Sequence, residues 1–266
     1  MLRVPFIFLL FFCLSFLLNL TSCSKPIGCV DNRAINYNPS ATVADASCIY
    51  PTLEIDFDLK LGNSDFEINR IYNIGGHNTA FKVFQFYVSN LQLVRSDQTM
   101  VNYDSLYPLI KTGQTTVPLG EVYMESYEHI QFKVGIEATT NHQIASYLND
   151  PTHPLRLQSP DTMHFNTNDG YIFLRMEGRV DRNGDGIPNQ NEAFDFRIGS
   201  DQLLKTIDLA LQKKIRKEVE SITIAVDVAE LLKQVDLQTD QQTHTANNLS
   251  LATKIANNIP SAIYIP

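Results

Sequence analysis

Oxygen-bearing side chains recur at alternate positions in the segment DRNGDGIPNQNE, which spans residues 181–192. The spacing D-x-N-x-D-G-x5-E is the ligand pattern of a calcium loop. Ca²⁺ is a hard cation that takes about six to eight oxygen ligands, so such a loop supplies carboxylates, amides and one backbone carbonyl. The candidate ligands are Asp181, Asn183, Asp185, the carbonyl of Ile187, Asn189 and Glu192. The sequence therefore predicts a calcium site, and the alternative is a polar turn that binds no ion.

The segments that flank this loop predict strands rather than helices. Residues 170–180 and 193–198 alternate apolar and polar side chains and are rich in aromatic and β-branched types. An EF-hand would need helices there, and Pro188 lacks the N–H through which that loop position pairs with a partner loop. We therefore expect a β-hairpin whose long turn wraps around calcium. The loop sequence resembles the extracellular calcium loops of thrombospondin type 3 and dockerin-like repeats.

The first 22 residues have the features of a secretory signal, with one Arg ahead of a long apolar run. The run ends in Leu20-Thr21-Ser22-Cys23, which is typical of a bacterial lipobox, so we expect cleavage before Cys23 and lipidation of its sulfur. A transmembrane anchor is the alternative. Ser24 follows the cysteine where an Asp would favour inner-membrane retention. The prediction is an outer-membrane lipoprotein of the cell envelope, and the face of the membrane stays open.

The remaining cysteines predict one disulfide. Cys13 belongs to the signal, which leaves Cys29 and Cys48 as a pair in an oxidising compartment. Residues 23–50 are then a lipidated cysteine followed by a small disulfide-closed module, which serves as a stalk. The module resembles a short two-cysteine module of secreted Bacteroidetes proteins, with Ala46 at the place of the usual Gly. Four residues could hold a second cation or cap turns, and we favour caps: Asp31, Asn36, Asn38 and Asp45.

The charge of the mature chain argues against nucleic acid as a partner. Removing Arg3 with the signal leaves 20 Lys and Arg against 29 Asp and Glu, a net charge of −9. A surface this acidic would repel the phosphate backbone.

Residues 51–266 read as strand after strand with polar connections and little helix. This favours an all-β fold, an antiparallel β-sandwich with the calcium-loop hairpin and a short C-terminal helix. We expect a kink at Asn90, edge strands around Pro108 and Pro118, and a helical turn over 229–235. The expected strands cover residues 53–61, 81–94, 101–110, 115–120, 129–138, 203–215 and 217–232, and the helix covers 243–259. The connection 139–169 has no period and is long enough to be functional.

An ordered set of short segments resembles the MbnP-like family of bacterial copper-binding proteins. They are FYVSNL (86–91), FKVGIE (132–137), DP (150–151), MHF (163–165), GYIF (170–173) and EG (177–178), with His244 ahead of an Ala/Asn-rich helix. The similarity covers about residues 52–266. It implies a periplasmic or surface β-sandwich in which histidines and an oxidised tryptophan bind copper. The implied partners are a dihaem peroxidase that makes that tryptophan product and a TonB-dependent receptor of an uptake system.

The chain departs from the family at the copper ligands. The family motif M-x-W-x-W reads MHFNT at residues 163–167, and the sequence contains no Trp, so the oxidised ligand cannot form. The family histidine of the strand after the hairpin is Arg197 here, and a guanidinium does not ligate copper. The remaining candidates are the imidazoles of His164 and His244 and the thioether of Met163. The alternative is that both histidines are solvated or hydrogen-bonded and bind no metal.

No motif of an enzyme is present: there is no nucleophile elbow, zinc-protease helix or phosphate loop. We therefore expect a protein without catalytic activity. The enzyme alternative is a glycosidase, whose two carboxylates would be distant in the sequence and leave no local motif. Two non-enzymatic functions compete. One is a lipid-anchored metal-binding protein, stabilised by calcium and involved in copper binding or handling. The other is a calcium-stiffened module that binds a protein or glycan partner through residues 139–169.

Overall fold

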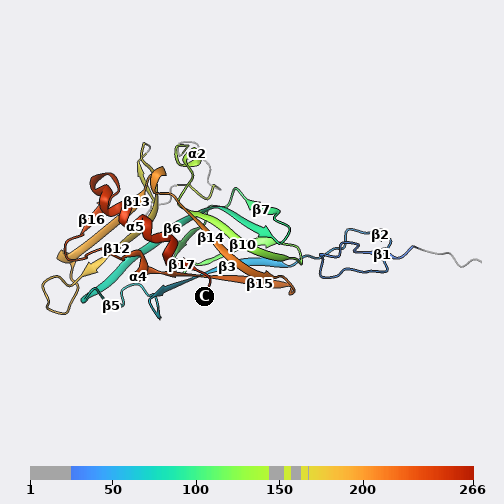
Figure 1. The fold of residues 1–266 in the computed structure, drawn as a ribbon, viewed down its shortest axis with the longest axis horizontal. Coiled ribbons are helices and arrows are strands. Elements are labelled where there is room, and N and C mark those ends of the chain that lie inside the picture. Colours follow the sequence, from blue (N-terminus) through green and yellow to red (C-terminus); the bar gives the residue numbers. More distant parts are fainter. Residues whose placement is uncertain (1–24, 144–152, 157–162, 167) are drawn as a thin grey trace, which may run out of the picture. The chain divides into compact units, whose positions relative to one another are not determined.

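The computed structural model describes residues 25–143, 153–156, 163–166 and 168–266. The predicted signal and the lipidation site Cys23 lie outside the described residues, as does part of the 139–169 connection. The chain divides into two compact units, Met1–Tyr50 and Pro51–Pro266 (Figure 1). In the described part, no helix combines the length and the apolar character that crossing a membrane requires.

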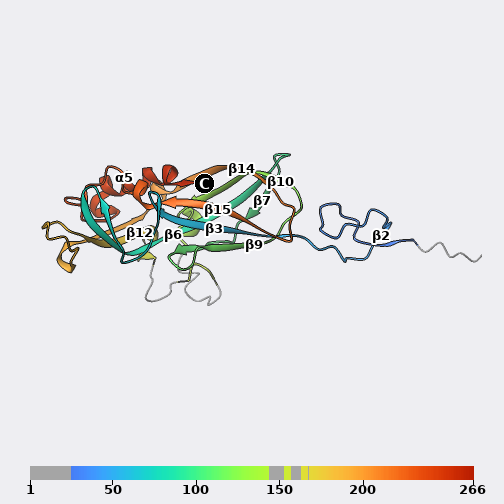
Figure 2. The same cartoon turned by 90° about the horizontal axis from the view of Figure 1, so that it is seen from below.

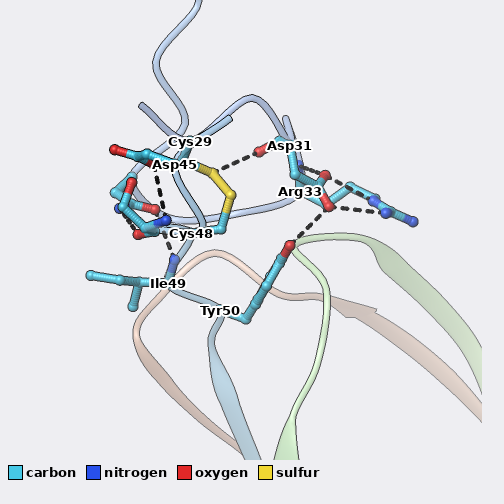
Figure 3. The surroundings of a disulfide bond; sticks show 9 residues. Cys29, Asp31, Arg33, Asp45, Cys48, Ile49 and Tyr50 are labelled. Atoms are coloured by element: carbon cyan, nitrogen blue, oxygen red, sulfur yellow. Dashed lines mark hydrogen bonds and ion pairs between the residues drawn. A yellow bond between two sulfur atoms is a disulfide. The ribbon is translucent and has the colours of Figure 1, made fainter. Parts of the chain in front are cut away.

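The first unit is held by the disulfide between Cys29 and Cys48, which confirms the predicted pairing (Figure 3). Two short strands, β1 (Ile27–Gly28) and β2 (Val43–Ala44), pair in parallel beside it. The four Asx side chains each accept a backbone N–H bond, from Arg33, Ile49, Ser40 and Ser47 respectively, at distances between 2.8 and 3.0 Å. Asp31, Asn38 and Asp45 bind the residue two positions ahead and so cap turns. Asn36 instead bridges to residues 47–49, since it also donates its amide to Ser47 O at 2.6 Å.

The second unit consists of two sheets. Ten strands of its described part form the larger sheet, ordered β14-β10-β6-β12-β13-β16 with four short strands beside this path. Five form the smaller sheet, ordered β17-β15-β3-β4 with β9 beside β3. Figure 2 labels β14, β10 and β6 of the larger sheet and β15, β3 and β9 of the smaller. The larger sheet contains β5 (Ile71–Ile74), β6 (His77–Arg95), β7 (Met100–Tyr103), β8 (Leu109–Lys111), β10 (Ser126–Val134), β11 (His164–Asn166), β12 (Gly170–Val180), β13 (Ala193–Gly199), β14 (Lys205–Lys214) and β16 (Gln242–His244). The smaller contains β3 (Thr52–Leu61), β4 (Ser64–Asp65), β9 (Thr116–Glu121), β15 (Val219–Asp227) and β17 (Ile263–Tyr264).

The two sheets pack face to face through aromatic side chains. Phe57 of β3 meets the rings of Phe86 and Phe132 from the larger sheet edge-on, with centroids 5.8 and 6.0 Å apart. Every second residue of β3 is buried, as expected for a strand with one face on the core. The predicted β-sandwich is therefore confirmed. Its sheets are mixed rather than purely antiparallel, because the β3–β15 and β13–β16 pairs are parallel.

Strand β6 spans the sandwich and changes partner along its length. Its first half pairs with β12 and its second half with β10. Within the second half Asn90 has φ 48°, and the register with β10 shifts beside it. Asn is one of the few residue types that tolerates this left-handed conformation. The predicted kink at Asn90 is therefore confirmed as a β-bulge.

The C-terminal helix α5 (Leu249–Ala262) starts later than the predicted residue 243. Residues 242–244 form β16 instead, because they pair with the open edge of β13 and so satisfy their backbone groups. Asn248 caps the helix by accepting the N–H of Leu251. Helix α5 contacts the short helix α4 (Val228–Leu231), the predicted helical turn, and also β13 and β14.

Candidate functional site

The calcium motif forms the turn of a β-hairpin, as its flanks predict. Strands β12 and β13 pair antiparallel up to Arg179 and Ala193, and the loop 181–192 connects them. A short 3₁₀ turn, Gln190–Glu192, ends the loop and leads into β13. This is a hairpin rather than an EF-hand, because strands flank the loop on both sides.

The carboxylates at the two ends of the loop close it by accepting backbone N–H bonds. The two carboxylate oxygens of Asp181 accept the N–H groups of Gly184 and Gly186, each at 2.8 Å. Glu192 Oε1 accepts the N–H groups of Arg182 at 2.8 Å and Asn183 at 2.9 Å. Asp181 and Glu192 are both buried. Both glycines have positive φ, 78° and 89°, which is the turn geometry that glycine adopts without strain.

The middle of the loop is exposed, and its side chains also bind neighbouring N–H groups. Asp185 Oδ1 accepts the N–H of Ile187, and Asn183 Oδ1 accepts that of Asp185, both at 2.8 Å. Asn189 donates its amide to Glu192 Oε2 at 2.5 Å. Burial acts to raise the pKa of Glu192, but hydrogen bonds from Asn183, Arg182 and Asn189 together hold that pKa below its usual value. Glu192 is therefore an anion at neutral pH.

The predicted calcium ligands lie on one loop, but their carboxylates do not converge on a point. Among the residues that the structure describes, no group of three or more His, Cys, Asp or Glu side chains is placed to hold a metal ion. The donor types still suit Ca²⁺, which prefers carboxylate, amide and carbonyl oxygens.

A cavity of about 530 Å³ opens where β13 and β16 end, beside the short helix α2 (Ala138–Asn141). It is lined by Asn141, His142, Phe165, Asn168, Asp169, Gly199, Ser200, Asp201, Gln202, His244, Thr245, Ala246 and Leu249. Two histidines, several amides, two carboxylates and one aromatic ring thus share a single depression.

His142 is held by a carboxylate at one side of the cavity. Its Nε2 lies 2.8 Å from Asp201 Oδ2, and Asn141 donates its amide to Asp201 Oδ1 at 3.0 Å. Asn141 is buried and also accepts the N–H of Tyr171 at 2.8 Å. A Cβ on Gly170 would stand 2.3 Å from the Asn141 amide oxygen, so this approach requires glycine. The buried amide therefore ties α2 and Asp201 to the start of β12.

His244 is held by a second carboxylate at the other side. Its Nε2 lies 2.9 Å from Asp195 Oδ2, while Arg197 donates its Nε to Asp195 Oδ1 at 3.0 Å. Arg197 also donates to Glu177 Oε1 at 3.1 Å. Arg197 and His244 are register partners on β13 and β16, so the guanidinium lies beside the imidazole and shares its carboxylate.

Two lining residues adopt backbone conformations that are rare without glycine. Ser200 has φ 103° and Thr245 has φ 59°, which for a β-branched residue is an outlier. The Thr245 hydroxyl donates to Arg197 O at 3.0 Å and accepts the N–H of Gly199 at 2.9 Å. Such strain persists only where surrounding bonds hold it, and it concentrates at functional sites.

Of the three predicted copper ligands, only His244 lines the cavity. Met163 is buried in an apolar cluster that includes Tyr171. The His164 ring lies against Tyr171 with centroids 5.7 Å apart, its Nε2 is buried without a hydrogen-bond partner among the described residues, and burial lowers its pKa. The structure thus places His142, rather than His164 or Met163, in the cavity with His244.

Phe165, at the first family tryptophan place, also lines this cavity. Its ring lies over Gly199, 2.7 Å from where a Cβ would be. Sequence reasoning missed His142 and Asp201 as a pair. The only available signal was that His142 lies in the aperiodic 139–169 connection, because a bond between residues 59 positions apart leaves no local pattern.

Comparisons with known proteins identify the family of this chain. A family model described as MbnP matches residues 50–249, more than half of the chain. Among solved structures, MbnP from Methylosinus trichosporium is similar, with 13% sequence identity, a TM-score of 0.49, and coverage of 70% of this chain and 79% of that chain. No curated protein matches.

Proposed function

Since the chain belongs to the MbnP family, we propose that it is a copper-binding protein of the cell envelope. The family is linked to copper handling. One observation carries the proposal for this chain: two imidazoles line the same cavity, and each is bonded through Nε2 to a carboxylate. Imidazole is a ligand that suits copper.

The carboxylates support a ligating role for His142 and His244. A metal-bound histidine commonly donates its other ring N–H to a carboxylate, which fixes the tautomer and raises the basicity of the ligating nitrogen. Here Asp201 and Asp195 bind Nε2, so Nδ1 of each ring is the nitrogen for the metal. Arg197 does not ligate, because it stays charged and paired with Asp195 and Glu177. The centre is therefore smaller than the one implied by the family motif.

Titration of the purified protein with Cu(I) and Cu(II) tests this function. We expect the His142→Ala, His244→Ala double variant to bind copper at least about a hundredfold more weakly, and Asp201→Asn to lose about tenfold through its supporting role. The matched control is His129→Ala, because His129 Nδ1 also lies 2.8 Å from a carboxylate, that of Asp208, away from the cavity. A copper affinity weaker than micromolar in the parent would contradict the proposal. So would an affinity that falls as much in the His129→Ala control as in the double variant.

A His164→Ala, Met163→Leu variant separates this centre from the ligand set that the sequence favours. We expect that variant to keep the parent's copper affinity, because neither side chain lines the cavity. A loss of affinity in this variant with none in the His142→Ala variant would move the centre to β11.

We also propose that the protein is lipid-anchored at Cys23 and that the loop 181–192 binds calcium as a structural ion. The support for calcium is the donor spacing together with a hairpin turn whose end carboxylates are already turned inward. Asp185→Ala is the informative variant, because Asp185 is exposed and its bonds lie within the loop. An ion at 100 times its Kd stabilises the folded state by about 2.7 kcal/mol.

We therefore expect calcium to raise the Tm of the parent and to leave the Tm of the Asp185→Ala variant unchanged. In excess chelator the two melting curves should coincide. A parent whose Tm does not respond to calcium or chelator would show that the loop is a polar turn only.

A second function is favoured by the lining of the cavity. Asn168 and Gln202 line the cavity together with Phe165, a combination of planar amides and an aromatic ring that suits a glycan. Screening the protein against a glycan panel tests this alternative. Binding that is lost in Phe165→Ala but unaffected by copper would favour the glycan over the metal.

A further inference from the structure

Exposed apolar side chains concentrate in the small disulfide module. Six of the twelve large apolar residues that are exposed in the described chain lie within residues 25–50, and the other six are spread over the much longer second unit. The six in the module are Ile27, Val30, Ile35, Tyr37, Val43 and Ile49. Single exposed apolar residues are normal on a protein surface, whereas a concentration of them marks an interaction surface.

The module cannot bury these side chains itself. Its buried apolar residues are only Cys29 and Ala34, so the disulfide replaces a core. Ile27 and Val43 are register partners on β1 and β2, so their side chains share one face, and they are 64% and 39% exposed. Ile49 is 53% exposed and extends away from the disulfide (Figure 3).

Charge distinguishes the module from the rest of the chain. Lys25 and Arg33 balance Asp31 and Asp45, so residues 25–50 are neutral. The chain carries −8, of which Arg3 contributes +1, and residues 51–266 therefore carry −9. An anionic membrane surface would repel the acidic second unit but not the neutral module.

We propose that residues 25–50 form a membrane-interface module, which lies on the lipid surface with Ile27, Val43 and their apolar neighbours among the headgroups. This rests on the lipid anchor proposed above. Ile27 follows Cys23 by four residues, so an acylated Cys23 keeps it within about 14 Å of the anchor. Apolar side chains together with tyrosine and lysine are the composition that interfacial segments use. The module is thus a second, non-covalent attachment beside the lipid.

Tryptophan fluorescence tests the proposal cleanly, because the chain has no Trp of its own. The acylated full-length protein is reconstituted into phosphatidylethanolamine and phosphatidylglycerol vesicles as the variant Ile27→Trp, and separately as Val43→Trp. Ile71→Trp is the matched control, since Ile71 is a 52% exposed strand residue of the second unit. We expect brominated lipid to quench about half of the emission in the two module variants and to leave the control unquenched.

The outcomes distinguish membrane contact of residues 25–50 from acylation of Cys23. Emission that is unquenched while the protein floats with the vesicles would overturn the proposal, and so would emission that is already blue-shifted without lipid, which would mean that protein covers the residue. If flotation fails and the Cys23 peptide carries no acyl mass, the anchor is refuted. Quenching after vesicles are added to that unacylated protein would still support the surface, and its absence would overturn it.

An aliphatic-to-polar change provides the second measurement. In the unacylated Cys23→Ser protein, replacing both Ile27 and Val43 by Ser should lower vesicle partitioning by at least about fivefold. The same change at the exposed residues Ile71 and Val219 should not alter partitioning. Equal partitioning in both double variants would overturn the proposal.

Discussion

Ala46 has φ 60°, a backbone conformation that favours glycine, and it occupies the glycine place of the module that the sequence resembles. An L-residue in this region costs about 1 kcal/mol relative to glycine. We therefore expect Ala46→Gly to stabilise the module by up to about 1 kcal/mol, measured as slower reduction of the Cys29–Cys48 disulfide by dithiothreitol in urea. Ala44→Gly is the control, because Ala44 lies in β2 without positive φ and should lose stability. A destabilised Ala46→Gly variant would contradict the prediction.

Asp31 links the stability of the module to pH. Hydrogen bonds from the Arg33 side chain and backbone, with a bond from Tyr50, hold the pKa of Asp31 far below its usual value (Figure 3). A depressed carboxyl pKa contributes stability above the unfolded pKa of about 4, and this contribution is lost as the pH falls through the folded pKa. We therefore expect the protection of the Arg33 amide against hydrogen exchange, taken relative to the intrinsic rate at each pH, to decrease progressively below about pH 4.

Asp31→Asn is the variant that checks this assignment. In this variant the Arg33 amide should exchange its hydrogen faster than in the parent at neutral pH. Its protection, corrected for the intrinsic pH dependence of exchange, should change less as the pH falls. An identical acid dependence in parent and variant would assign the effect to another carboxyl.

At the scale of elements, the close packing of three strands requires a glycine in β12. A Cβ on Gly178 would stand 2.5 Å from Ala80 O of β6 and from the Phe194 ring of β13, neither of which is a flexible side-chain end. Gly178→Ala should therefore destabilise the sandwich by about 2 to 3 kcal/mol through overpacking. Gly62→Ala is the control, because its Cβ would meet nothing within 4 Å although its φ is 59°. Urea unfolding should show a cost of about 1 kcal/mol there, from backbone strain alone, and equal costs would contradict the steric account.

The bulge in β6 gives a second test at this scale. Asn90→Gly should be near neutral because glycine accepts φ 48° freely, whereas Asn90→Val should cost about 2 kcal/mol because a β-branched residue does not. Thermal unfolding of the two variants compares the same position with opposite expectations. If valine were tolerated as well as glycine, the kink would not depend on residue 90.

At the scale of the whole molecule, helix α5 packs against strands of both sheets. Its contacts include β13, β14 and β15, and Ile255 at its centre is fully buried. Ile255→Ala should destabilise the protein by about 3 kcal/mol, through the lost transfer energy and the cavity left behind. Ser250→Ala, in the exposed first turn, should change the free energy of unfolding by less than about 0.5 kcal/mol. A similar effect of both changes in urea unfolding would mean that α5 only lies on the surface.

Several short strands leave no recognisable pattern in the sequence, because they depend on the rest of the molecule. Strands β4, β5, β11, β16 and β17 have two to four residues each, too few for alternation to be recognised. They form because they add to an existing sheet edge, as β16 does beside β13. This pairing, rather than any local preference, is what brings His244 next to Arg197.

The sequence alone determined what depends on neighbouring residues. Such features are the alternation in β3 and β6, the spacing of oxygen-bearing side chains across 181–192, and the strand flanks of that loop. The pairing of the two remaining cysteines followed from their count alone. The tertiary structure decided which distant side chains meet. His142 reaches Asp201 and His244 reaches Asp195 because α2, η2 (Asp201–Leu203), β13 and β16 converge at one end of the sandwich. Such contacts follow from sheet order and register, which a linear pattern does not encode.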